Sequence, residues 1–179
     1  MKFNWNDAWL FTKDAKLVSG THGALNADQW EKVDLPHTWN AKDGQDGGND
    51  YYRGTCYYTK KLALAECKDA EQVYIEFEGA NSSADVYVNG TLAVHHDGGY
   101  STFRANITEL LKEENEIVVA VDNAPNDRVY PQMADFTFYG GIYRDVNIVC
   151  VNNTHFDLDY YGAPGIKITP TVNGADATV

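Results

Sequence analysis

The feature that most constrains the fold of this chain is a period of two in its short apolar runs. In residues 72–79, Val73, Ile75 and Phe77 alternate with more polar side chains. Successive side chains of a strand point to opposite faces of a sheet, so this run predicts a strand with one buried face. The same alternation recurs in residues 85–88, 116–122 and 142–151, of which the last is the longest candidate strand.

Turn residues separate these runs. Asn89-Gly90 is the dipeptide that most readily forms a type I′ hairpin turn, because both of its central residues need a positive φ. Residues 91–94 then read as the returning strand. No stretch of a dozen residues has helical periodicity, so the pattern predicts an all-β fold, either a sandwich or a barrel. The length of 179 residues suits one domain with a short extension.

The charge of the chain excludes two classes of partner. Its formal net charge is −12, and its densest basic cluster is the pair Lys60-Lys61. A nucleic-acid-binding protein needs a basic surface to neutralise phosphates, so we expect no nucleic-acid partner. An acidic membrane surface would repel the chain, and no apolar run approaches the length that spans a bilayer, so we expect no membrane partner.

The number and spacing of the cysteines indicate the redox environment of the protein. The three cysteines, Cys56, Cys67 and Cys150, are widely spaced and include no Cys-x-x-Cys pair. They predict buried free thiols, which favours a reducing environment. The polar start of the sequence lacks the apolar core of a signal peptide. A cytoplasmic location is therefore expected, and export stays open because a signal could have been removed.

Two long irregular stretches and a change of pattern organise the rest of the chain. Residues 37–53 are rich in Gly, Asp and Asn, and residues 123–141 are also irregular. Long loops inside a domain tend to carry function. The strand pattern breaks after Val151, and residues 166–172 read as a new strand. We therefore expect one domain over residues 1–151, followed in residues 152–179 by a linker and the start of a truncated second β domain.

Six short motifs occur in order along the chain. They are residues 34–40 (DLPHTWN), 51–58 (YYRGTCYY), 77–80 (FEGA), 85–90 (DVYVNG), 96–103 (HDGGYSTF) and 140–146 (GGIYRDV). In order and spacing, residues 5–151 resemble the amino-terminal domain of family 2 glycoside hydrolases, in particular β-galactosidases. Residues 161–166 resemble the entry into the family's immunoglobulin-like second domain.

The resemblance implies a fold and a division of labour. The fold would be a jelly-roll β-sandwich of the galactose-binding-domain type, followed by the truncated immunoglobulin-like domain. The parent enzyme would hydrolyse a terminal β-galactoside with retention of configuration. Retaining glycosidases use two carboxylic acids about 5 Å apart. In the family both are glutamates of a TIM barrel, and no segment here resembles those motifs, so no catalytic residue is expected. The remainder of the parent enzyme would be the partner.

The resemblance also implies where sugar is contacted. Asp135 matches an aspartate that reaches the mouth of the barrel in related β-galactosidases, where it contacts sugar hydroxyls and in some members a sodium ion. Asp46, Asn40 and Phe138 are the other residues predicted to bind substrate. No cofactor is expected in this chain beyond Na⁺ at Asp135, and Mg²⁺ would belong to the parent barrel. The acids around Asp46 do not follow the calcium-binding spacing of an EF-hand.

Other interpretations stay open. The chain could be a stand-alone carbohydrate-binding module, a structural interaction domain, or the same domain of a β-glucuronidase or β-mannosidase. His37 is interpreted as a packing residue, since no Ser/His/Asp pattern accompanies it. His95 and His96 should point to opposite faces of a strand and so not share a metal. The apolar alternation in residues 166–172 also predicts docking on the sandwich or strand pairing between molecules, and hence a homo-oligomer.

Overall fold

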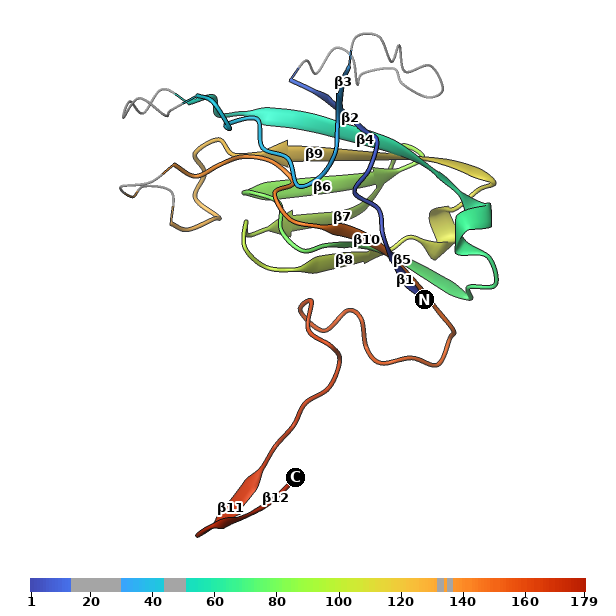
Figure 1. Ribbon diagram of the computed structural model, residues 1–179, viewed down its shortest axis with the longest axis vertical. Coiled ribbons are helices and arrows are strands. Elements are labelled where there is room, and N and C mark those ends of the chain that lie inside the picture. Colours follow the sequence, from blue (N-terminus) through green and yellow to red (C-terminus); the bar gives the residue numbers. More distant parts are fainter. Residues whose placement is uncertain (14–29, 44–50, 132–133, 135–136) are drawn as a thin grey trace.

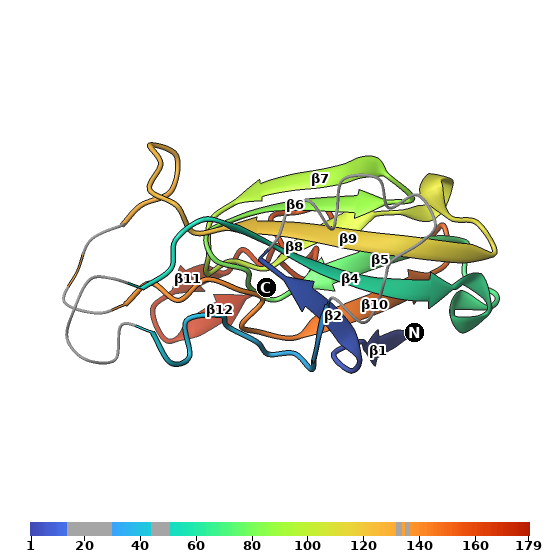
Figure 2. The ribbon, with the colours of Figure 1, turned by 90° about the horizontal axis from the view of Figure 1, so that it is seen from above.

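The computed structural model describes residues 1–13, 30–43, 51–131, 134 and 137–179 and contains two antiparallel sheets packed face to face (Figure 1). The six-stranded sheet has the order β3-β2-β4-β9-β6-β7, and the four-stranded sheet has the order β1-β10-β5-β8. In Figure 2 the first sheet lies over the second. The strands of the six-stranded sheet are β2 (Trp9–Thr12), β3 (Glu31–Val33), β4 (Thr55–Ala63), β6 (Ser83–Val88), β7 (Thr91–Asp97) and β9 (Glu114–Asp122). Those of the four-stranded sheet are β1 (Lys2–Asn4), β5 (Gln72–Phe77), β8 (Phe103–Asn106) and β10 (Val146–Val151).

This architecture confirms the predicted all-β jelly-roll sandwich. The alternation in β9 places Ile117, Val119 and Val121 in the core, each fully buried. Asn89 and Gly90 have φ angles of 52° and 80°, as a type I′ turn requires, and they join β6 to β7. The helical content of the described residues is two short 3₁₀ turns, η3 (Leu64–Cys67) and η4 (Thr108–Leu110).

The core lies between the two sheets and explains the state of the cysteines. Trp9, Tyr58 and Ile75 are among its fully buried side chains. All three cysteines are buried and free, which confirms the prediction of free thiols. Burial raises the pKa of the Cys56 thiol to about 12, so this group stays protonated and unreactive at neutral pH.

Two expected strands differ from the observed ones. Strand β10 begins at Val146 and not at residue 142, because Ile142 uses its carbonyl to accept a 2.8 Å hydrogen bond from the His37 backbone N–H. The apolar alternation in residues 166–172 does not make a strand of that extent. Instead β11 (Thr171–Asn173) pairs with β12 (Asp176–Thr178) in a small hairpin that stands away from the sandwich (Figure 1).

The remaining sequence predictions on the fold concern the adjacent histidines, membrane spans and the domain boundary. His95 and His96 do point apart, since His95 lies 2.6 Å from Asp85 at the surface whereas His96 stacks on Phe103 with ring centroids 4.2 Å apart. In the part of the chain that the structure describes, no helix is long and apolar enough to cross a membrane. The division into residues 1–151 and a truncated second domain stays a prediction.

Candidate functional site

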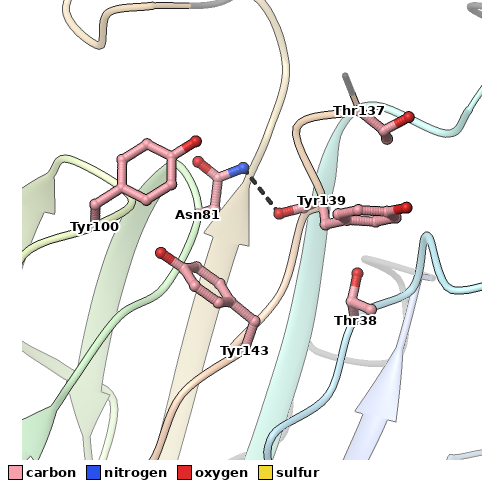
Figure 3. A pocket seen from close by; sticks show the side chains of 6 residues that line it. All are labelled: Thr38, Asn81, Tyr100, Thr137, Tyr139 and Tyr143. Carbon is pink, nitrogen blue, oxygen red and sulfur yellow. Dashed lines mark hydrogen bonds between the residues drawn. The ribbon is translucent and has the colours of Figure 1, made fainter. Parts of the chain in front are cut away.

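One end of the sandwich carries a hollow of about 360 Å³. Its lining comes from the loops after β3, β5, β7 and β9, which meet there although they are far apart in the sequence (Figure 3). We call it the tyrosine pocket, and its six lining residues are Thr38, Asn81, Tyr100, Thr137, Tyr139 and Tyr143. The pocket therefore unites both irregular stretches that the sequence singled out.

Asn81 organises the floor of the tyrosine pocket. Its backbone exchanges two hydrogen bonds with Gly141, over 3.0 and 3.3 Å, and its side-chain amide donates to the Tyr139 carbonyl over 2.8 Å (Figure 3). Gly99 packs so closely that a Cβ there would lie 2.3 Å from the Asn81 Oδ1. The Tyr143 hydroxyl donates to the Gly99 carbonyl. These contacts hold the Tyr143 ring and the backbone of Tyr139 in place.

A buried amide network lies behind the pocket and centres on Asn40, which is fully buried. Its Oδ1 accepts hydrogen bonds from the Gly140 N–H (2.8 Å) and the Asn123 Nδ2 (3.2 Å). Its Nδ2 donates to both oxygens of the Asp43 carboxylate (3.1 Å) and to the Tyr52 carbonyl (3.0 Å). An Asn side chain has two donor hydrogens and two acceptor lone pairs, so these contacts use its whole capacity.

Of the four residues predicted to bind substrate, the structure describes Asn40 and Phe138. A sugar contact by Asn40 would have to replace one of the hydrogen bonds above. Phe138 is buried, between two residues that line the tyrosine pocket. Asp135 and Asp46 lie outside the described residues. All four assignments stay predictions, and the structure adds that Asn40 joins the loops to one another.

The described residues also bear on metal binding. Outside residues 14–29, 44–50, 132–133 and 135–136, no group of three or more His, Cys, Asp or Glu side chains could hold a metal ion. In the surface pair of acids beside His95, Asp85 contacts Nδ1 and Asp97 contacts Nε2. The two acids thus lie on opposite sides of one ring and cannot converge on one ion. A sodium ion at Asp135 stays a prediction.

His37 lies next to the pocket but does not form a catalytic pair. Its Nδ1 lies 2.8 Å from the Tyr58 hydroxyl, and its ring packs 4.8 Å from the ring of Phe11. Burial lowers the pKa of His37 and raises the pKa of Tyr58 well above its usual value. Both groups are therefore neutral near pH 7, which agrees with the interpretation of His37 as a packing residue.

The accessible surface of the tyrosine pocket is mostly apolar. None of its six lining residues is charged, and Tyr100 and Tyr139 are partly exposed. Aromatic faces with hydroxyl groups at their edges can pack on an apolar surface and hydrogen-bond at the same time. The arrangement suits a carbohydrate or a protein segment, and it contains no nucleophile activated by a base.

Sequence reasoning missed Asn81, Asn123 and Tyr143 as residues that shape this end of the sandwich. Tyr143 belongs to the motif of residues 140–146, which carried the resemblance without a role for the tyrosine. Asn81 lies one residue after the motif of residues 77–80. For Asn123 no local signal existed, because its partners Tyr52 and Asn40 are 71 and 83 residues away.

The fold and the pocket define a class, namely a jelly-roll sandwich domain with a loop-built pocket at one end. The family model described as "Glycosyl hydrolases family 2, sugar binding domain" matches residues 5–152. The chain belongs to this family.

Relatives with different printed activities resemble the chain. A putative β-glucuronidase of Formosa agariphila is 40% identical over 156 residues, which cover 86% of this chain and 19% of the relative. A β-galactosidase of Thermoanaerobacter pseudethanolicus is 32% identical over 185 residues, covering 97% and 25%. The crystal structure of a Bacteroides uniformis β-glucuronidase matches with a TM-score of 0.83 and 37% identity over 92% of this chain and 19% of that chain. The chain thus spans only about a fifth to a quarter of the length of these relatives.

Proposed function

We propose that this chain is the non-catalytic amino-terminal domain of a longer retaining β-glycosidase. The observation that carries the proposal is the family match over residues 5–152 together with the small share of each relative that the chain covers. Retaining hydrolysis needs an acid/base and a nucleophilic carboxylate, which we assign to a part of the protein beyond this sequence. The domain contributes loop residues to the rim of that active site.

The pocket end of the sandwich is where we place this rim. Asp135 precedes the pocket residue Thr137 by two positions, and Asp46 follows Asp43 by three. Asp43 is itself anchored, since its carboxylate accepts hydrogen bonds from the Asn40 side chain and from the Tyr52 N–H (2.9 Å). In the sequence, Asp46 therefore follows, and Asp135 precedes, a residue that is held by the sandwich. An ionised carboxylate accepts strong, charge-assisted hydrogen bonds from sugar hydroxyls.

The substrate we favour is a β-glucuronide. The β-glucuronidase relative is 40% identical to the chain, whereas the β-galactosidase relative is 32% identical. A β-galactoside, which the sequence motifs predicted, is the second candidate. It is favoured by the uncharged lining of the tyrosine pocket, which offers no cation to a glucuronate carboxylate.

Turnover by the whole protein tests the proposal. The complete protein should hydrolyse p-nitrophenyl β-glucuronide faster than the matching β-galactoside, and the reverse order would select the second candidate. The 179-residue chain alone should hydrolyse neither. Turnover by the carefully purified chain would overturn the non-catalytic role.

A stand-alone carbohydrate-binding module is the alternative that the comparisons do not favour. The matching family model describes a domain of glycosyl hydrolases, and the relatives are named as glycosidases. Isothermal titration of the 179-residue chain with galactose, lactose and glucuronate distinguishes the two. A site completed by another part of the protein predicts no measurable binding. Millimolar or tighter binding would favour the module.

A further inference from the structure

The outer face of the four-stranded sheet is covered, although the alternation of apolar and polar residues in its strands predicts only one buried face. In β5, Val73, Ile75 and Phe77 point into the core, so Tyr74 and Glu76 point away from it. Both outward residues are nevertheless buried, with 2% and 3% of their surface exposed. Side chains of the same sheet, Lys2, Arg104 and Asn147, enclose Glu76. Tyr74 lies against a further segment of the chain.

The cover is the chain that follows β10 (Figure 1). Residues 153–165, which we call the strap, turn back below this sheet after Val151. The Asn153 N–H donates to Glu71 over 2.7 Å where the strap begins, and the ring of His155 meets that of Tyr74 edge-on, with centroids 5.9 Å apart. The strap thus starts by packing on the end of β5 next to β10.

Arg104 of β8 holds the middle of the strap. Its Nε lies 2.5 Å from the Glu76 carboxylate, and its Nη1 donates to the carbonyls of Leu158 (3.0 Å) and Ala163 (3.1 Å). The side chains of Arg104 and Glu76 are only 10% and 4% exposed. The rigid guanidinium fork lets one residue neutralise a buried acid and bind two backbone carbonyls of the strap.

Gly162 fits the strap to the sandwich from the other side. It has a φ of +68°, and a Cβ at this position would lie 2.1 Å from the Thr102 carbonyl oxygen. Any other residue would meet both a steric clash and an unfavourable backbone conformation. After Gly165 the chain is exposed as far as Val179, so these contacts end where the chain leaves the sandwich.

We propose that residues 153–165 are an integral part of the sandwich, and that Arg104 is the positioning residue that locks them onto the four-stranded sheet and fixes the direction in which the chain leaves it. The inference goes beyond the proposed function and holds whichever sugar the whole protein cleaves. In this arrangement the segment that follows the strap starts from a fixed point on the sheet. A linker without these contacts would leave the orientation of that segment unconstrained.

Limited proteolysis of the 179-residue chain by chymotrypsin tests the proposal. Phe156, Leu158, Tyr160 and Tyr161 are target residues inside the strap. Cleavage after Leu158, followed by mass spectrometry, reports the population in which the strap has lifted from the sheet, because Arg104 holds the carbonyl of this residue and its side chain is half-buried. Arg104→Gln should raise its rate about tenfold or more, since hydrogen bonds from a charged donor are lost. Far-ultraviolet circular dichroism should show that the sandwich is still folded.

The matched control is Lys2→Gln. Lys2 also pairs with Glu76, over 2.6 Å, but the hydrogen bonds of its ammonium group go to Glu76 and Glu78 and not to the strap. This variant should leave cleavage of the strap close to that of the wild-type chain. Gly162→Ala disturbs the strap without touching the ion pair and should accelerate cleavage as Arg104→Gln does. It keeps the test decisive if the arginine variant does not fold.

Two outcomes would overturn the proposal. One is strap cleavage at the wild-type rate in both Arg104→Gln and Gly162→Ala. The other is an equal increase in Lys2→Gln and Arg104→Gln, which would mean that cleavage follows general loosening of the sheet. Neither result would affect the proposed hydrolase function, because these variants leave the tyrosine pocket intact.

Discussion

The tyrosine pocket and the outer face of the four-stranded sheet are both built by loops that return to the sandwich, but different chemistry holds them. Side-chain amides order the pocket end, where Asn40, Asn81 and Asn123 bond to backbone groups, and Asn40 also bonds to Asn123 and to the Asp43 carboxylate. Charges order the outer face, where Glu76 lies between Lys2 and Arg104. Amides do not titrate, and the charged partner in this network is the Asp43 carboxylate, so the order of the pocket end should depend less on pH than that of the outer face.

Removing the centre of the amide network should have the largest effect on stability. Asn40→Ala removes one hydrogen bond from each of three groups: the Gly140 N–H, the Asn123 amide and the Tyr52 carbonyl. We expect the free energy of unfolding to fall by about 3 kcal/mol, because buried polar groups lose hydrogen bonds. Urea denaturation measures this. Asn4→Ala, which removes one exposed side-chain contact to the Asn6 N–H, is the control and should change it little.

Removing the buried charge of Glu76 should have the next largest effect and should depend on pH. Burial by itself would raise the pKa of this carboxyl, but hydrogen bonds and charges from Lys2 and Arg104 outweigh it, so its pKa lies below the ordinary 4.5. Its contribution to stability is therefore present above pH 4.5 and is lost as the pH falls through the lower folded-state pKa. Glu76→Gln should cost about 2 kcal/mol at pH 6.

Denaturation of Glu76→Gln and wild-type chains from pH 6 to pH 3 checks the sign. The difference between the two proteins should shrink on acidification. Glu78, the other acid near Lys2, is present in both proteins. A difference that grows towards low pH would contradict the assignment of the ionic contacts.

Substitution of the proposed sugar-binding residue Asp135 should change activity and not stability. In the complete protein, Asp135→Ala should lower kcat/KM by about tenfold or more, which corresponds to about 1.4 kcal/mol of lost transition-state stabilisation. Asp127→Ala removes an exposed acid from the same irregular stretch of sequence, residues 123–141, and serves as the control. A wild-type kcat/KM in Asp135→Ala would refute the role in substrate binding, and an unfolded variant would make the residue structural.

Truncation after Gly165 should show the smallest effect, and comparison with a shorter chain should locate the end of the folded unit. Ending the chain after Gly165 removes the exposed hairpin of β11 and β12, and we expect the melting temperature to stay within about 1 °C. Ending it after Val151 removes the strap as well and should lower the melting temperature by several degrees, since Tyr74 loses its contact with His155 and Arg104 loses two carbonyl partners. Equal melting temperatures for the two truncations would mean that the strap adds nothing to the sandwich.

Local patterns predicted the strands where one face of a strand is buried and the turn is short. The alternation in residues 116–122 and the Asn89-Gly90 turn were sufficient for β9 and for the β6–β7 hairpin. The same reasoning failed in residues 166–172, because alternation only indicates which side of a strand is apolar. It does not supply a neighbouring strand, and Ile168 is exposed in the structure.

The amino-acid sequence by itself determined the all-β class, the strands β5, β6, β7 and β9 and the family, because alternation, turn residues and motifs are local properties. Only the tertiary structure decided that Asn40 is buried with its hydrogen-bonding capacity used, and that Glu76 is covered on the outer face of its sheet. The partners responsible are distant: Gly140 is 100 residues from Asn40, and the strap carbonyl of Ala163 is 59 residues from Arg104. Contacts at such separations depend on how the loops pack back onto the sheets, and the local alternation of apolar and polar residues carries no information about that packing.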